Sequence, residues 1–246
     1  MTAFTKLTIT ELRLLLREPL ATFFSVFFPS ILVAILGAVP SFREPGEELG
    51  GLRVIDLYVG IAVVLTLAML ALQVTPGVLS TYREKGILRR LATTPVPPAV
   101  LLGAQLAAAM ITALVSVALV LALGRIAYAV PLPANLPGFA LAFVLAALGI
   151  FAVGLFISAV VPNSKAATAA GTLLFFPMMF FAGLWTPRQV MPEMLQRVSD
   201  FMPLGAGERA LHEAMTGHWP NLLSVTVLVG YLAVFGVASA RLFRWS

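Results

Sequence analysis

The sequence predicts an all-α integral membrane protein with six transmembrane helices. Of its 246 residues, 60% are hydrophobic and only 11% are charged, and the mean hydropathy is +0.98. Soluble globular domains have roughly 45–50% apolar and about 25% charged residues, so this composition is that of a membrane protein. Six apolar stretches also reach the roughly 20 residues that a helix needs to cross the hydrocarbon core of a bilayer.

The six stretches fill most of the chain and predict a single transmembrane domain over residues 1–246. They are residues 20–39, 58–79, 100–124, 136–161, 166–185 and 222–242. Pro29 predicts a kink in the first span, and residues 162–165 predict a tight hairpin between the fourth and fifth spans. Gly149 and Gly154 in the fourth span predict close contacts between helices.

The segment before the first span predicts a helix at the membrane interface. Residues 6–17 mix leucines with the charged side chains of Lys6, Glu11, Arg13 and Arg17. Such a mixture is typical of an amphipathic helix that lies in the plane of the lipid headgroups. We therefore expect an N-terminal interfacial helix ahead of the six spans.

The distribution of charge predicts the orientation of the chain. If the N-terminus is cytoplasmic, ten of the 16 Lys and Arg residues fall on the cytoplasmic side and six on the other. Three of the 11 acidic residues fall on the cytoplasmic side and eight on the other. Because cytoplasmic loops carry an excess of Lys and Arg, we expect both termini in the cytoplasm of a bacterium and the chain in its cell membrane. The same rule explains the basic pI of 10.1 without a nucleic-acid partner.

Several function classes are disfavoured. The chain has no cysteine, which excludes disulfides and thiolate metal sites, and its two histidines do not predict a metal site. None of its three lysines follows a glycine, so the Gly-Lys-Ser/Thr phosphate-binding loop of an ATPase is missing. A proton-coupled carrier needs a titratable group at membrane depth, and the spans hold no carboxylate or lysine. They also hold no set of nucleophile, base and orienting group, so we expect no enzyme and no bound cofactor.

The most polar segment lies between the second and third spans. Five ionised side chains occur within residues 83–90, and three prolines follow before the third span. Residues 80–92 predict a short amphipathic helix that these prolines end. This helix either lies on the lipid surface or docks a cytoplasmic partner. In the second case, two leucines anchor the helix and two arginines pair with acidic groups of the partner: Leu88, Leu91, Arg89 and Arg90.

The same segment resembles part of a known family. The run Tyr82-Arg-Glu-Lys-Gly-Ile-Leu-Arg-Arg-Leu-Ala-Thr-Thr-Pro95 resembles the cytoplasmic loop of the type-two ABC exporter permeases, the family of the daunorubicin-resistance permeases. A second resemblance follows the fifth span, in residues 176–177, 181–187, 191–196 and 202–211. Together with the number and order of the spans, the resemblance covers essentially the whole chain.

The resemblance implies a permease with no ATPase of its own. In that family a loop helix docks into a separate nucleotide-binding subunit, which binds ATP and Mg, and two permeases assemble with two such subunits. The expected partners are therefore an ATPase subunit and a second copy of this chain or a homologous permease. Residue by residue, the resemblance assigns to the docking helix Arg83, Glu84, Lys85, Gly86, Leu88, Arg89 and Arg90. Closure of the ATPase subunits would move this helix and, with it, the second and third spans.

The resemblance also implies where cargo crosses the membrane. In the family, the second and fifth spans of both permeases line the path. In this chain those spans offer Gln73, Thr75, Phe175, Phe176, Met179 and Phe180. Phenylalanine and methionine form an adaptable apolar wall, which suits hydrophobic or amphipathic cargo. Each of these side chains could equally face lipid or pack against a neighbouring helix.

The stretch between the fifth and sixth spans is too long for a structureless loop. Residues 193–201 and 207–215 have helical spacing with apolar residues on one side. The resemblance implies short helices that dip back toward the membrane and cap the exit, with Pro187, Pro203 and Leu204 as an external gate. The alternative is a pair of helices that lie on the outer leaflet.

The leading functional prediction is the permease subunit of an ATP-driven exporter of a drug, an antibiotic or a lipid-like molecule. One alternative is a permease of the same family that exports a polysaccharide or a lipid-linked glycan. Another, from a different class, is a membrane scaffold or receptor that binds a soluble partner without transport. Gln73 supplies most of the polarity expected along the path, and this low polarity disfavours a glycan.

Overall fold

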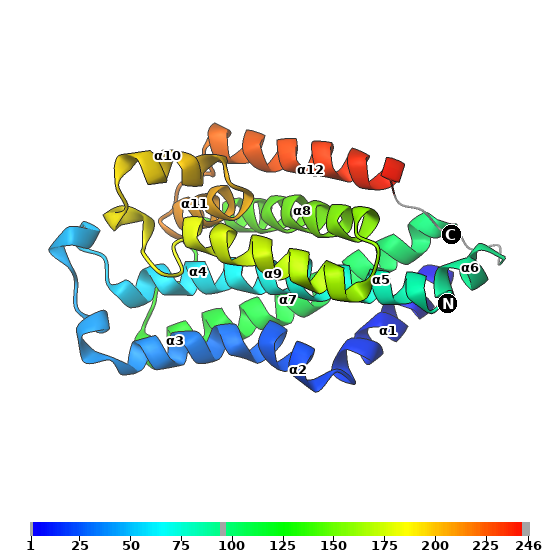
Figure 1. Ribbon diagram of the computed structural model, residues 1–246. Helices are drawn as coiled ribbons and strands as arrows, with labels where there is room; N and C mark the ends of the chain where they lie inside the picture. Colours follow the sequence, from blue (N-terminus) through cyan, green and yellow to red (C-terminus); the bar gives the residue numbers. More distant parts are fainter. Residues whose placement is uncertain (1, 94–96, 243–246) are drawn as a thin grey trace.

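The computed structural model describes residues 2–93 and 97–242. Over these residues the elements are helices, with no β-strand, and six helices are long and apolar enough to cross a membrane. They are Pro19–Ala38, Val54–Glu84, Val100–Tyr128, Leu136–Val160, Ser164–Phe181 and Leu222–Leu242. Figure 1 shows that these helices run roughly along one common direction. The predicted all-α class with six membrane helices is confirmed.

The N-terminal part of the chain contains the predicted interfacial helix and an interrupted first span. Helix α1 (Ala3–Leu16) packs along α7. The first span consists of α2 (Pro19–Thr22), the π-helical segment η1 (Phe23–Phe27) and α3 (Phe28–Ala38). Pro29 has no amide hydrogen, so the carbonyl group four residues earlier lacks its α-helical partner. The wider π-helical turn lies where this hydrogen bond is missing.

The second span is the longest and the most deeply buried of the six. It consists of α4 (Val54–Ala68), the π-helical segment η4 (Met69–Val74) and α5 (Thr75–Glu84), and α4 packs against α3, α7, α8 and α11. Its π-helical segment again comes just before a proline, Pro76. This span is longer at both ends than the predicted residues 58–79, so it carries backbone from one membrane surface into the polar segment at the other.

The polar segment forms two pieces rather than one helix. Helix α5 continues to Glu84, Gly86 has a φ of +67°, and α6 (Ile87–Ala92) begins directly afterwards. Glycine adopts this left-handed conformation far more readily than other residues, so the turn is encoded in the sequence. The expectation of one helix over residues 80–92 is therefore wrong in its extent.

The third, fourth and fifth spans are α7 (Pro98–Tyr128), α8 (Leu136–Val160) and α9 (Ser164–Phe181). The predicted hairpin between α8 and α9 is present, and the side chain of Asn163 caps α9 by accepting a hydrogen bond from the Ala166 amide at 2.8 Å. Helix α9 ends four residues before the predicted end at residue 185.

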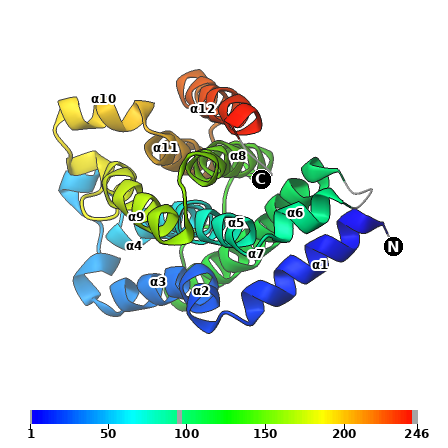
Figure 2. The same cartoon turned by 45° about the vertical axis from the view of Figure 1, so that its right-hand side comes forward.

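Two short helices and the last span complete the chain. Helix α10 (Glu193–Phe201) has the predicted bounds, α11 (Pro203–Met215) begins four residues earlier than predicted, and α12 (Leu222–Leu242) is the sixth span. Helix α11 packs against α8, α12, α4 and α9, and both views show it beside α8 (Figures 1 and 2). The alternative of two helices on the outer leaflet is wrong for α11, because most of its side chains are buried.

Glycines set the closest approaches in the bundle. A Cβ atom at Gly154 of α8 would overlap the carbonyl oxygen of Ala71, and one at Gly171 of α9 would overlap that of Leu72. The π-helical segment η4 is thus wedged between α8 and α9 at backbone contact distance. A Cβ at Gly149 would lie 3.2 Å from the carbonyl oxygen of Leu228 in α12. The predicted close contacts at Gly149 and Gly154 are confirmed.

Candidate functional site

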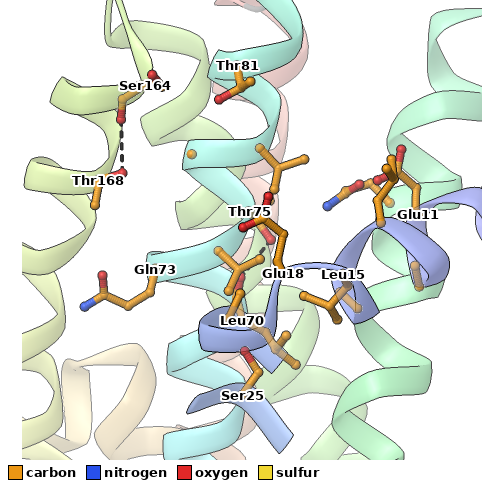
Figure 3. Close-up of a pocket in the computed structure, with 18 of the residues that line it drawn as sticks. Glu11, Leu15, Glu18, Ser25, Leu70, Gln73, Thr75, Thr81, Ser164 and Thr168 are labelled. Carbon is orange, nitrogen blue, oxygen red and sulfur yellow. Dashed lines mark hydrogen bonds between the residues drawn. The ribbon is translucent and has the colours of Figure 1, made fainter. Parts of the chain in front are cut away.

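The candidate site is a cavity of about 750 Å³ at the end of the bundle that holds α1 and α6. Side chains from α1, α2, η1, η4, α5, α7 and α9 line it, and we call it the α1–α5 cavity. Figure 3 shows lining side chains of α1, α2 and η1 on one side of η4 and α5, and those of α9 on the other. Both π-helical segments therefore contribute to its wall. Such segments widen a helix locally and are frequent at functional sites.

Apolar side chains form one part of the wall of the α1–α5 cavity. They come from α1 and from the first and second spans: Leu14, Leu15, Leu20, Phe24, Met69, Leu70, Val74 and Val78. A wall of this kind holds the apolar part of a ligand without fixing its orientation. The orientation of such a ligand depends on the polar groups that line the same space.

One carboxyl group lines the cavity from a buried position. Glu11 of α1 is only 6% exposed, and its two oxygens accept the Tyr82 hydroxyl of α5 at 3.0 and 2.9 Å. Burial raises the pKa of Glu11, and the hydrogen bond from Tyr82 partly opposes this rise. Glu11 is not among the site residues predicted from the sequence. The available signal was a lone acidic residue among the leucines of the predicted amphipathic helix.

Two residues that line the cavity carry buried polar atoms without a hydrogen-bond partner among the described residues. They are Ser25 Oγ of η1 and Gln105 Oε1 of α7, both buried. Four other lining residues are charged and exposed, and they surround the buried part: Arg17, Glu18, Lys85 and Lys165. The cavity thus combines a hydrated, mixed-charge rim with a buried carboxyl group and an aliphatic wall.

The structure brings only two of the six predicted path residues into this cavity. Gln73 lines it and accepts a hydrogen bond from Thr172 at 3.0 Å. Thr75 also lines it, and its hydroxyl donates to the carbonyl oxygen of Leu70 at 2.8 Å, which satisfies a backbone group of the π-helical segment.

The other four predicted path residues lie elsewhere on α9. Phe175 and Met179 are buried in the bundle. Phe180 is half-buried, and Phe176 is 54% exposed with its ring 6.0 Å from that of Trp185. Phe176 and Phe180 therefore lie on a more outward part of α9 and do not line the cavity. Their assignment to the path stays a prediction.

Two of the predicted docking residues bind their own chain. Arg83 donates to the carbonyl oxygens of Ser158, at 3.1 Å, and Val161. Glu84 accepts the amide of Ser164 at 2.7 Å and its hydroxyl at 3.0 Å. The bonds from Arg83 satisfy carbonyl groups at the end of α8, and the bonds to Glu84 satisfy the amide and hydroxyl of Ser164 at the start of α9. Helix ends leave such backbone groups without partners inside the helix. Arg83 and Glu84 thus fasten the end of α5 to the α8–α9 hairpin.

The remaining docking residues divide into buried and exposed ones. Leu88 has no exposed surface in the isolated chain, and its expected role as an anchor for a partner stays a prediction. The side chain of Leu91 lies outside the described residues. Lys85, Arg89 and Arg90 are exposed around the Gly86 turn, and we call these three side chains the α6 basic patch.

The predicted gate residues lie at the opposite end of the bundle, in the segments that an ion-pair network joins. Pro203 and Leu204 are buried at the start of α11, and Pro187 is half-buried before a 3₁₀ turn. Asp200 of α10 pairs with Arg188 at 2.7 Å and with Arg209 of α11 at 3.0 Å. These pairs tie the outer segments together, while the gating role stays a prediction.

Six apolar helices, of which the first, second, third and fifth spans contribute to the wall of an amphipathic cavity, define a multi-pass membrane protein. The chain belongs to the ABC-2 type transporter family, whose sequence model matches residues 2–216. The family suggested by the sequence alone is thereby confirmed.

Named relatives are similar at 25–28% identity. The Bacillus subtilis protein YvfS, whose name calls it a putative transport permease, is 27% identical over 168 residues, 66% of each chain. The inner membrane transport permease YhhJ of Escherichia coli is 25% identical over 188 residues, 73% of this chain and 50% of its own. A daunorubicin resistance ABC transporter permease of Streptomyces coeruleorubidus is 28% identical over 112 residues, 44% and 36% of the two chains. The chain thus matches from about a third to two thirds of the length of these relatives.

Proposed function

We propose that this chain is the permease subunit of an ATP-driven exporter of hydrophobic or amphipathic molecules. Membership of the ABC-2 type transporter family supports the transport role. A separate nucleotide-binding subunit binds ATP and Mg and supplies the energy, and a second permease completes the assembly. The α6 basic patch lies on the cytoplasmic side, as do both termini, in agreement with the distribution of Lys and Arg.

The observation that carries the proposal is the connection between the α6 basic patch and the spans. Arg89 and Arg90 are exposed for pairing with acidic groups of an ATPase subunit. Directly behind them, Arg83 and Glu84 fasten α5 to the α8–α9 hairpin. A displacement of α6 is therefore transmitted to α5 and to the start of α9 together. These two helices line the α1–α5 cavity.

The wall of the cavity suits an amphipathic cargo. Apolar side chains of α1 and of the first two spans make up one part of it, and polar side chains such as Gln73, Thr75 and Gln105 line the rest. A drug-resistance permease among the relatives agrees with such a cargo. Export of a polysaccharide or lipid-linked glycan is the second candidate, and a scaffold that binds a soluble partner without transport is the third.

The test is copurification of the chain with a co-expressed ABC ATPase subunit, together with ATPase activity and export of a fluorescent amphiphile. The double variant Arg89→Glu/Arg90→Glu reverses both charges, and we expect it to weaken the complex by at least about tenfold and to abolish export. Arg197→Glu is the matched control, since its side chain is 81% exposed on α10 at the opposite end. We expect it to behave as the wild type.

Three outcomes decide between the candidates. An intact complex and normal export in the double variant contradict the docking role of the α6 basic patch. A complex whose ATPase rate responds to a lipid-linked glycan and not to amphiphiles favours the second candidate. A complex whose ATPase rate responds to no cargo favours the scaffold.

A further inference from the structure

We infer that the buried part of the α1–α5 cavity binds the ammonium group of an amphipathic cation, with Glu11 as its counter-ion. The inference rests on the proposed function only in taking this cation to be the cargo. The binding site itself is a property of the isolated chain. The family model and the names of the relatives assign no residue to such a site.

The packing of the N-terminal segment on α7 places the relevant groups together. A Cβ atom at Gly103 of α7 would lie 3.4 Å from the ring of Phe4 in α1. Further along, the Ser116 hydroxyl of α7 donates to the carbonyl oxygen of Val26 at 3.1 Å. The two segments therefore run side by side in the same direction. Glu11 on one and Gln105 on the other lie between these two contacts, and both line the cavity.

The buried part of the cavity holds acceptors that lack donors. Among the described residues, the two oxygens of Glu11 receive hydrogen bonds from the single Tyr82 hydroxyl, and Gln105 Oε1 receives none. A buried acceptor without a donor is unfavourable. An ammonium group has three N–H donors and a positive charge, so it supplies what these oxygens lack.

The charges around the cavity favour a cation in its buried part. Arg17, Lys85 and Lys165 line the cavity but are exposed, where water weakens their interaction with a bound group, and Glu18 lies at the same rim. Glu11 is the buried charge, so its interaction with a ligand is the least screened. A carboxylate or phosphate would be repelled there. The aliphatic side chains next to Glu11, such as Leu14 and Leu15, suit the apolar part of the same ligand.

Tyr82 holds Glu11 without neutralising it. The hydroxyl donates one hydrogen bond, which leaves acceptor capacity on both carboxylate oxygens. It also joins α1 to α5 directly before Arg83 and Glu84, which clamp α5 to the α8–α9 hairpin. Glu11 is therefore linked through Tyr82 to the same helix end that the α6 basic patch would move.

The test compares three fluorescent probes that share one apolar group: 4-(1-pyrenyl)butylamine, its uncharged N-acetyl derivative, and the anionic pyrenebutyrate. Binding to the purified chain is followed by fluorescence anisotropy. We expect the wild type to prefer the amine, and Glu11→Gln to weaken amine binding by about ten- to hundredfold, the range for the loss of one hydrogen bond to a charged group. Binding of the N-acetyl derivative should not change. Glu193→Gln, an exposed carboxylate on α10, is the matched control.

A second variant separates charge from structure. Tyr82→Phe removes the hydrogen bond from Tyr82 and keeps the carboxylate, whereas Glu11→Gln keeps an oxygen that can accept this bond and removes the charge. We therefore expect Tyr82→Phe to bind the amine at least as tightly as the wild type. Equal losses in both variants would show a structural role for the pair and overturn the inference. Equal affinity of the wild type for the amine and pyrenebutyrate would overturn it as well. Copurification with the ATPase subunit is measured separately, so either result leaves the proposed function standing.

Discussion

At the scale of single residues, Glu208 is a carboxyl group whose buried position in the folded chain disfavours its charged form. It lies on α11 with 5% of its surface exposed. Burial raises its pKa to about 7, and the nearby charge of Glu213 adds to the rise, while Arg188 and Arg209 oppose it. The folded chain therefore keeps a proton on Glu208 between pH 4.5 and about 7, where the unfolded chain has lost it. Stability must fall as the pH rises through this window.

This linkage predicts how Glu208→Gln behaves. The difference in pKa corresponds to about 3 kcal/mol of unfolding free energy, which the wild type loses between pH 4.5 and 8 and the variant does not. Burial lowers the pKa of neighbouring His212, which gives a slope of the opposite sign in both proteins, so the difference between them isolates Glu208. Thermal unfolding of the purified chains at both pH values measures it. Identical pH dependence in the two proteins would contradict the prediction, and Glu193→Gln is the control.

Residue roles could be predicted only where they depend on local sequence. The exposure of Lys85, Arg89 and Arg90 follows from their crowding in a polar segment between two spans. The inward roles of Arg83 and Glu84 could not be predicted, because their partners come from the α8–α9 hairpin about 80 residues later. Their charges satisfy helix ends that only the folded chain brings near.

At the scale of elements, η4 lies so close to α8 and α9 that Gly171 of α9 has no room for a side chain. Gly171→Ala places a Cβ atom against the carbonyl oxygen of Leu72, so we expect a loss of about 1–3 kcal/mol of stability, as for other overpacked sites. Gly230→Ala in α12 is the matched control, since a Cβ there has no neighbour within 4 Å. It should stabilise its helix slightly, by up to about 1 kcal/mol. Unfolding by heat or denaturant in detergent compares the two, and equal stabilities would refute the wedge.

The sequence located the helices better than it located their irregularities. Apolar length predicts the spans because lipid leaves a helix few alternatives. The prolines at positions 29 and 76 mark where backbone hydrogen bonds are lost, yet nothing local determines that the chain responds with π-helical segments. The sequence left open whether α11 dips back toward the membrane or lies on the outer leaflet, and its Gly205, Ala206 and Gly207 allow it to pack inside the bundle.

At the scale of the whole molecule, the ends of the bundle differ in what they present. Helices α1 and α6 and the end of α12 lie at one end, and α10 lies at the other (Figure 1). The first end carries the α6 basic patch and the rim of the α1–α5 cavity. The second carries the network around Asp200. This asymmetry agrees with the orientation that the distribution of Lys and Arg favours. Docking of a cytoplasmic ATPase subunit at the α6 basic patch requires that orientation.

The orientation can be tested with single cysteines, because the natural chain has none. Thr93→Cys, exposed next to α6, and Glu193→Cys, exposed on α10, report the two ends. In intact cells a membrane-impermeant maleimide should label Glu193→Cys and leave Thr93→Cys unlabelled, and inverted membrane vesicles should give the opposite pattern. Permeabilised cells, in which both cysteines should react, control for accessibility. Labelling of Thr93→Cys in intact cells would place the α6 basic patch outside the cytoplasm, where no ATP-driven subunit could use it.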